Sequence, residues 1–213
     1  LGMSYYFKKR PETAISLIKK SLEINPKNSD ARNNLASIYY TEKNYPEALK
    51  QYQVVLEDLE YESQYRVYYN VALIHLQKGD TYKSIENLKS SLEAKADYCP
   101  AHYLFGDIYF ANGDYPKALL SYKKSSHGTC TGDPKPHNAQ AETLMKMGKF
   151  GEATQKYEEI INSFPSSEYA ILAQKKIDYI ANSKGRLLEE INRTEHLFKN
   201  PKEEIKKAEA SDF

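Results

Sequence analysis

The stretch that decides the fold is DIYFANGDYPKALLSY, residues 107–122. It begins with a helix-like apolar pattern, continues through Gly113, and ends with a second helix-like pattern. Glycine adopts a positive φ at low cost, so Gly113 can end the first helix and allow a tight reversal of the chain. The stretch therefore predicts two helices that are joined by a short turn and pack side by side.

The same unit recurs along the chain. It reads LIHLQKGDTYKSIENL at residues 73–88, TLMKMGKFGEATQKY at residues 143–157 and IYYTEKNYPEALKQY at residues 38–52. Gly79 and Gly148 occupy the turn in two of these copies. The other copy has Asn44 near the turn, and asparagine tolerates the left-handed region better than most non-glycine residues.

A period of about 35 residues sets the register of the units. Small residues recur in the second helix at Ala14, Ala48, Ser84, Ala118 and Ala153. Twelve residues upstream, the first helix has Gly2, Ala36, Ala72, Gly106 and Ala141. Large side chains recur in the second helix at Ile18, Tyr52, Leu88, Tyr122 and Tyr157. Small residues at both positions allow the two helices of a pair to approach closely, and the large side chains fill the space between them.

This period and pattern resemble the tetratricopeptide repeat, including its A-x3-Y spacing and the endings EINPKN and NSFPSS. The resemblance covers residues 1–182 and implies an all-α fold, a right-handed superhelix of about six helix-turn-helix repeats. The repeats are expected to start near residues 1, 29, 65, 99, 134 and 168. Since the chain starts at the seventh position of its first repeat, we expect further residues upstream.

The end of the chain departs from the repeat. SSEYAILAQKKIDYIANSKG and RLLEEINRTEHLF, residues 166–185 and 186–198, are predicted to form a degenerate sixth helix pair. Residues 183–199 are then the last helix or cap of the array, and residues 200–213 are a charged C-terminal tail. A terminal unit whose outer face meets water is expected to depart from the pattern in this way.

Composition and motifs argue against catalysis. The 30 basic and 29 acidic residues give a net charge of +1, which offers no argument for nucleic acid or an anionic membrane as a partner. No glycine-rich phosphate loop and no nucleophile elbow occur. His127, Cys130 and His137 lie near one another, but a zinc site needs a fourth ligand and a reactive cysteine needs an orienting third group. We therefore expect no enzyme activity, no metal and no cofactor.

The resemblance implies that the first helices of the repeats line a concave groove. The predicted groove residues are Tyr6, Tyr40, Tyr69, Leu73, Leu76, Tyr103, Phe110 and Met145. Tyr69, Leu73 and Leu76 follow i, i+4 and i+7 spacing, on a face additional to the core face of the same helix. A helix that is apolar on most of its circumference must bury both faces or keep one for a partner, which favours a peptide-binding groove.

Two other interpretations of the groove residues remain. Their side chains can simply support neighbouring helices of the array. The groove can also hold a carboxylate clamp, as in family members that bind chaperone tails. Arg66 and Lys135 are far apart in repeat register for such a clamp, and Asp107 and Glu142 would repel an acidic tail.

The two cysteines of the chain, Cys99 and Cys130, are positions 1 and 32 of the fourth repeat. In an antiparallel helix pair, the start of the first helix and the end of the second are neighbours. This arrangement can bring the Cα atoms within the roughly 7 Å that a disulfide requires. A disulfide implies an oxidising compartment such as the periplasm. The alternative is a pair of reduced cysteines in a cytosolic protein.

The array, the lengthened junction between its second and third repeats and the cysteine pair resemble the pilotins of bacterial type IV pili. The resemblance is carried by residues 56–80, 97–119 and 128–150. It implies a monomeric outer-membrane lipoprotein that faces the periplasm and assists secretin assembly by holding an apolar segment. Membrane attachment would then come only from a lipid anchor upstream of Leu1. The alternatives are a cytosolic adaptor in a multiprotein complex and a different cell-envelope protein, such as one that serves peptidoglycan machinery.

Overall fold

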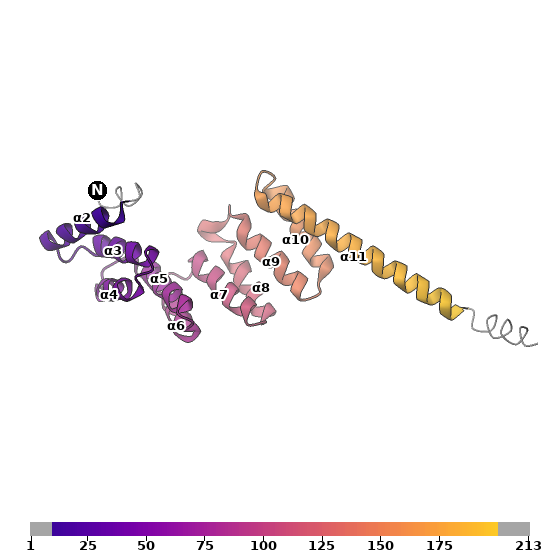
Figure 1. The fold of residues 1–213 in the computed structure, drawn as a ribbon, viewed down its shortest axis with the longest axis horizontal. Helices are drawn as coiled ribbons and strands as arrows, with labels where there is room; N and C mark the ends of the chain where they lie inside the picture. The colour runs from indigo at the N-terminus through magenta and orange to yellow at the C-terminus, as the bar shows by residue number, and fades with distance from the viewer. Residues whose placement is uncertain (1–9, 200–213) are drawn as a thin grey trace, which may run out of the picture. The chain divides into compact units, whose positions relative to one another are not determined.

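The computed structural model describes residues 10–199, and within them it contains ten α-helices, one 3-10 turn and no strand (Figure 1). This confirms the all-α prediction. The elements are α2 (Pro11–Ile24), α3 (Ser29–Thr41), α4 (Tyr45–Leu56), α5 (Gln64–Gln77), α6 (Thr81–Ala94), α7 (Cys99–Ala111), α8 (Tyr115–Ser125), η1 (Gly128–Cys130), α9 (Pro134–Lys146), α10 (Phe150–Ser163) and α11 (Glu168–Lys199).

The described helices belong to two compact units, which divide between Pro136 and His137. In the first unit, α3 packs against α4, α5 against α6, and α7 against α8. In the second unit, α10 packs against α11. We call α3, α5 and α7 the first helices of their pairs and α4, α6 and α8 the second helices. The repeat expected from the 35-residue period is therefore visible as a succession of helix pairs.

Positive φ angles make the turns within the pairs possible. Gly79 and Gly113 both have φ of 77°, a conformation that costs glycine little because it has no Cβ. The corresponding residue between α3 and α4 is Lys43, with φ of 59°. Asn44 instead has φ of −83° and its side chain accepts a hydrogen bond from the Glu47 amide, so it caps α4. The expectation that Asn44 replaces the turn glycine is therefore wrong, because the asparagine is needed as the cap.

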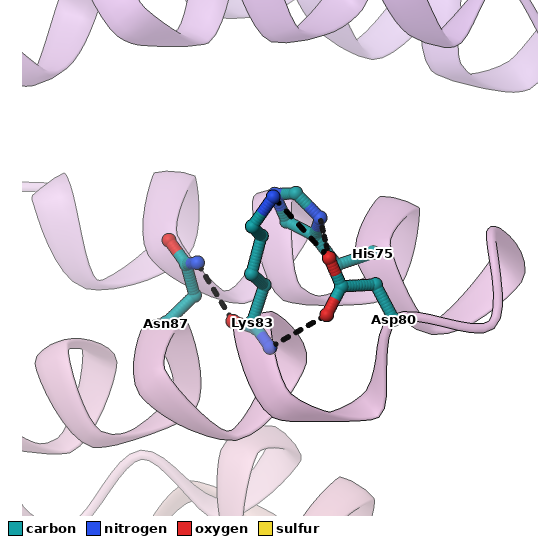
Figure 2. Close-up of polar contacts among 4 residues, drawn as sticks. All are labelled: His75, Asp80, Lys83 and Asn87. Carbon is teal, nitrogen blue, oxygen red and sulfur yellow. Dashed lines mark hydrogen bonds and ion pairs between the residues drawn. The ribbon is translucent and has the colours of Figure 1, made fainter.

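Asp80 shows how the capping residue joins both helices of a pair (Figure 2). Its Oδ1 accepts a hydrogen bond of 3.0 Å from the Lys83 amide, which satisfies a free donor at the start of α6. Its Oδ2 lies 3.4 Å from Lys83 Nζ and 3.8 Å from Nδ1 of His75 on α5. The Lys83 amide is the largest of the causes that lower the pKa of Asp80, so the cap is ionised at neutral pH.

Close approach of the two helices explains why the small positions of the repeat are small. A Cβ added to Gly106 on α7 would lie 2.4 Å from the ring of Tyr122 on α8, well inside van der Waals contact. Ala36 and Ala48, the corresponding pair in α3 and α4, are both fully buried. The large side chains Tyr52 and Leu88 are fully buried as well. These positions therefore form the core between the helices of each pair.

The C-terminal helix differs from the prediction of a degenerate sixth pair. Helix α11 runs without a break over 32 residues. The expected boundary near residue 182 has no proline and no turn pair of glycine and aspartate, and the single Gly185 costs a helix only about 1 kcal/mol. The prediction of a separate last helix at 183–199 is therefore wrong. The charged tail predicted for residues 200–213 lies outside the described residues.

Candidate partner-binding site

The described groove residues of the first unit lie on first helices and are partly exposed. We call this the first-helix face, defined by Tyr40 on α3, by Tyr69, Leu73 and Leu76 on α5, and by Tyr103 and Phe110 on α7. Met145 is also partly exposed but lies on α9 in the second unit. Tyr6 lies outside the described residues. The part of the predicted groove that can be examined as one surface is therefore the first-helix face.

Tyr69 is at the centre of the first-helix face. Burial is the main cause that raises its pKa to about 12, and Tyr98, Tyr40 and Asp107 raise it further in that order. Tyr40 belongs to α3 and Asp107 to α7, so groups from both neighbouring first helices lie within electrostatic reach of the Tyr69 hydroxyl. The face therefore continues across three helix pairs.

The rings of the face also pack inside their own repeats. Tyr40 lies 6.0 Å from Tyr45, measured between ring centroids, and Phe110 lies 5.5 Å from Tyr115. In both pairs the second ring is the first residue of the second helix. Each ring thus supports the turn of its own pair with one side and leaves the other side partly exposed. Helix support and partner binding are compatible uses of the same side chains.

Polar side chains occupy the repeat position of Leu73 in α3 and α7. Each is hydrogen-bonded to the large residue of the same repeat, fifteen positions along the chain. The oxygens of Ser37 and Tyr52 are 3.1 Å apart and share a hydrogen bond. The hydroxyl of Tyr122 donates a hydrogen bond of 2.8 Å to Asp107. Burial raises the pKa of Asp107, against the opposing effects of this bond and of the Lys135 charge. Ser37 and Asp107 are therefore engaged in holding their helix pairs together.

In the second unit, the residue fifteen positions before the large residue Tyr157 is Glu142. Burial raises the pKa of Tyr157, and the nearby carboxylate of Glu142 raises it further. The same carboxylate accepts from Lys176 Nζ on α11 at 2.9 Å. Glu142 is thus paired with the C-terminal helix through Lys176 and lies near the Tyr157 hydroxyl, without the hydrogen bond that joins Asp107 to Tyr122.

A small pocket opens at one end of the first-helix face. Its volume is about 140 Å³, and Tyr69, Tyr103 and Lys135 are among its lining residues. Cys99 and Cys130 also line it and form a disulfide, with their Cα atoms 6.2 Å apart. The disulfide connects the buried start of α7 to the short turn η1 that follows α8.

Three models of the tetratricopeptide repeat match the chain, over residues 8–66, 65–98 and 139–167, and together they cover more than half of it. The chain belongs to the tetratricopeptide-repeat family. Such repeats are in general non-catalytic scaffolds that bind peptides or other proteins.

Among curated proteins, this tetratricopeptide-repeat chain is similar to DnaJ homolog subfamily C member 3. The mouse protein is 26% identical over 114 residues, which are 48% of this chain and 23% of the relative. The chicken protein is 25% identical over 129 residues, which are 55% of this chain and 26% of the relative. The chain thus spans about a quarter of the length of these relatives.

Solved structures show the same fold at low sequence identity. PilF of Pseudomonas aeruginosa is 18% identical, with a TM-score of 0.67 over 82% of this chain and 78% of that chain. PilW, described as a widely conserved type IV pilus biogenesis factor, is 20% identical, with a TM-score of 0.67 over 79% and 77%. YrrB, described as having an unusual peptide-binding site, is 16% identical, with a TM-score of 0.59 over 82% and 88%.

Among the side chains that the structure describes, which end at residue 183, no group of three or more His, Cys, Asp and Glu residues is placed to hold a metal ion. The described helices also include none that is long and apolar enough to cross a membrane.

The sequence predicted Tyr69 and Tyr103 as binding residues but not Pro100 and Pro136, and it indicated Lys135 only as a cation too far from Arg66 for a clamp. Lys135 Nζ lies 4.4 Å from the centre of the Tyr103 ring, close enough for a cation–π interaction. In contrast, Arg66 lies over the ring of Tyr65, 5.5 Å from its centre. The two cations that a carboxylate clamp would need are thus placed on different rings.

Proposed function

We propose that this chain is a non-enzymatic scaffold that binds an apolar segment of a partner protein on the first-helix face. The observation that carries the proposal is the partial exposure of six apolar or aromatic side chains on three successive first helices of one unit. Two or three such contacts give on the order of 10 kcal/mol of gross burial energy. The costs of association remove much of this, so we expect a dissociation constant in the micromolar range.

The partner that we propose is the secretin of a type IV pilus. Support comes from the resemblance to pilotins and from the fold shared with PilF and with PilW, the latter described as a pilus biogenesis factor. In this role the protein is a monomer at the periplasmic face of the outer membrane, attached by a lipid anchor upstream of the sequence. The disulfide between Cys99 and Cys130 supports an oxidising compartment.

An adaptor in another multiprotein complex, cytosolic or in the cell envelope, is the second candidate. It is supported by the similarity to DnaJ homolog subfamily C member 3, whose name gives no role in pili. Titration of thiols in protein from the native host separates the compartments. Two free thiols before reduction favour the cytosol and contradict the periplasmic proposal.

Two matched leucines allow the binding face to be tested. Leu76 lies on the first-helix face, whereas Leu120 lies on the second helix α8 and is 56% exposed. We expect Leu76→Glu to lose capture of the secretin from host membranes, identified by mass spectrometry, and Leu120→Glu to retain it. Circular dichroism checks that both variants fold, and Phe110→Ala gives a second face variant. Equal capture by Leu76→Glu, Phe110→Ala and Leu120→Glu would place the interface elsewhere.

A further inference from the structure

The pocket beside the disulfide has the size and the lining to bind one apolar side chain. An apolar cavity of roughly 150 Å³ in another protein holds a benzene molecule, and this pocket measures about 140 Å³. The apolar part of its wall is formed by the rings of Tyr69 and Tyr103, the side chains of Pro100 and Pro136 and the disulfide, and Ser125, Asp133 and Lys135 form the polar part. Aromatic rings and prolines offer large apolar surfaces at low conformational cost, so a phenylalanine or a leucine fits this pocket best.

The same pocket is lined by a positively charged side chain, Lys135. Lys135 is exposed, and its Nζ lies 4.4 Å from the centre of the Tyr103 ring. Among the residues whose side chains the structure describes, 10–128 and 130–183, no ion pair within 4.0 Å includes Lys135. An ammonium group in this setting attracts a carboxylate that reaches the mouth of the pocket.

Asp133 and Asp107 each accept a hydrogen bond from a group other than the Lys135 ammonium. Asp133 Oδ1 accepts a hydrogen bond of 2.9 Å from the Lys135 amide. Asp107 Oδ1 accepts from the Tyr122 hydroxyl, although the Lys135 charge still lowers the pKa of this carboxyl. The Lys135 side chain therefore has room for a carboxylate that the described part of the chain does not supply.

We propose that this pocket takes one bulky apolar side chain of the partner segment, and that Lys135 pairs with an acidic residue next to it. The occupant is a segment of another protein, chosen by the charge at the pocket. This rests on the proposed function, in which the first-helix face holds an apolar segment, and it adds the chemistry by which the segment is selected.

The test uses the full chain, labelled with 15N, and three synthetic peptides with blocked ends. The first is acetyl-Gly-Ser-Phe-Glu-Ser-Gly-amide, the second has Ala in place of Phe, and the third has Lys in place of Glu. The terminal amide removes the free carboxylate that a clamp would grip. We expect the first peptide to shift the amide signals of Cys99, Tyr103 and Lys135. We expect the second to bind at least about tenfold more weakly, because the ring is not buried.

Charge reversal then examines the acidic position. We expect Lys135→Glu to weaken the first peptide about threefold, as for an exposed ion pair, and to strengthen the peptide with Lys by a similar factor. Lys124→Glu is the control, since Lys124 is an exposed lysine on α8 that lines a different pocket. We expect Lys124→Glu to change neither affinity by as much as twofold. Tyr103→Ala, with folding checked by circular dichroism, should weaken the first peptide about tenfold.

Three results would overturn the pocket assignment. The first is equal binding of the Phe and Ala peptides. The second is a Lys135→Glu variant that still prefers the peptide with Glu over the peptide with Lys. The third is a wild-type dimer that Tyr103→Ala makes monomeric in sedimentation, because the occupant would then be a second copy of the chain.

The pocket assignment and the proposed function can fail separately. Loss of secretin capture by Leu76→Glu without the expected peptide binding removes only the pocket assignment. The expected peptide binding without secretin capture by the wild-type chain removes only the proposed function.

Discussion

Gly106→Ala adds one methyl group at the point where α7 and α8 are closest. The new Cβ would lie 2.4 Å from Cε1 and 2.5 Å from Cδ1 of the Tyr122 ring. Ordinary contact begins at 3.4 Å, so the ring must move by about 1 Å. Tyr122 is only 3% exposed and its hydroxyl donates to Asp107 at 2.8 Å, so the ring cannot move without straining its packing and that bond.

The magnitude follows from three terms. Overpacking a buried site costs about 2 kcal/mol. Loss of the hydrogen bond between Tyr122 and Asp107 costs about 1 kcal/mol. The alanine returns about 1 kcal/mol because it favours the helix more than glycine does. We therefore expect Gly106→Ala to lower the free energy of unfolding by about 2 kcal/mol.

The assay is urea unfolding of the full chain, followed by circular dichroism. Gly151→Ala is the matched control, because Gly151 also lies in a helix and a Cβ there would meet nothing within 4 Å. It should be neutral or stabilise the chain by up to about 1 kcal/mol. The double variant of Gly106→Ala with Tyr122→Ala should cost less than the sum of the two single changes, since the methyl group then occupies vacated space. Additive costs, or a Gly106→Ala chain as stable as Gly151→Ala, would refute the close-approach argument.

Three further predictions concern the disulfide, a turn and a buried carboxyl. Cys99→Ser with Cys130→Ser should lower the free energy of unfolding by about 3.7 kcal/mol, as chain entropy gives for a separation of 31 residues; urea midpoints without reductant that match the wild type would contradict a formed disulfide. Lys43→Gly should raise stability by about 1 kcal/mol, since it relieves a positive φ at a non-glycine residue, and a loss of stability in thermal unfolding would contradict this. Asp107→Asn should be more stable than the wild type at neutral pH, because burial raises the pKa of the ionised carboxyl and so penalises it in the folded state. The difference in urea midpoint should shrink as the pH falls towards the ordinary value of 3.8, and a constant difference would count against titration of this group.

The helix pairs were predictable because their signals are local. Gly79 and Gly113 are followed at once by a capping aspartate, so residue type alone marks the turn and the start of the second helix. Lys43 was missed because a lysine gives no sign of a positive φ. The repeat position of Lys43 does indicate a positive φ, because Lys43 and Asn44 occupy the places that Gly79 and Asp80 have in the next repeat.

The site was harder to predict because part of it lies where repeats meet. Tyr69 and Tyr103 share one repeat position, so the period of the sequence selects both. Lys135 lies 32 residues after Tyr103, near the start of the next first helix, and only the folding of η1 and the start of α9 brings its Nζ over that ring. Long separations of this kind carry no periodic signal.

The chemistry of the first-helix face is linked to the core behind it. Where the large core residue is Tyr52 or Tyr122, its hydroxyl needs a partner, and the face residue fifteen positions earlier is polar. Where the large residue is Leu88, no hydroxyl has to be satisfied, and the corresponding face residue, Leu73, is apolar. A buried hydroxyl without a partner costs roughly 1–3 kcal/mol, so the polar residues cannot be exchanged for apolar ones while the tyrosines remain. Among the three described helix pairs of the first unit, the pair with leucine as its large residue thus permits the apolar centre of the face. A partner that prefers this centre is selected in part by residues that it never touches.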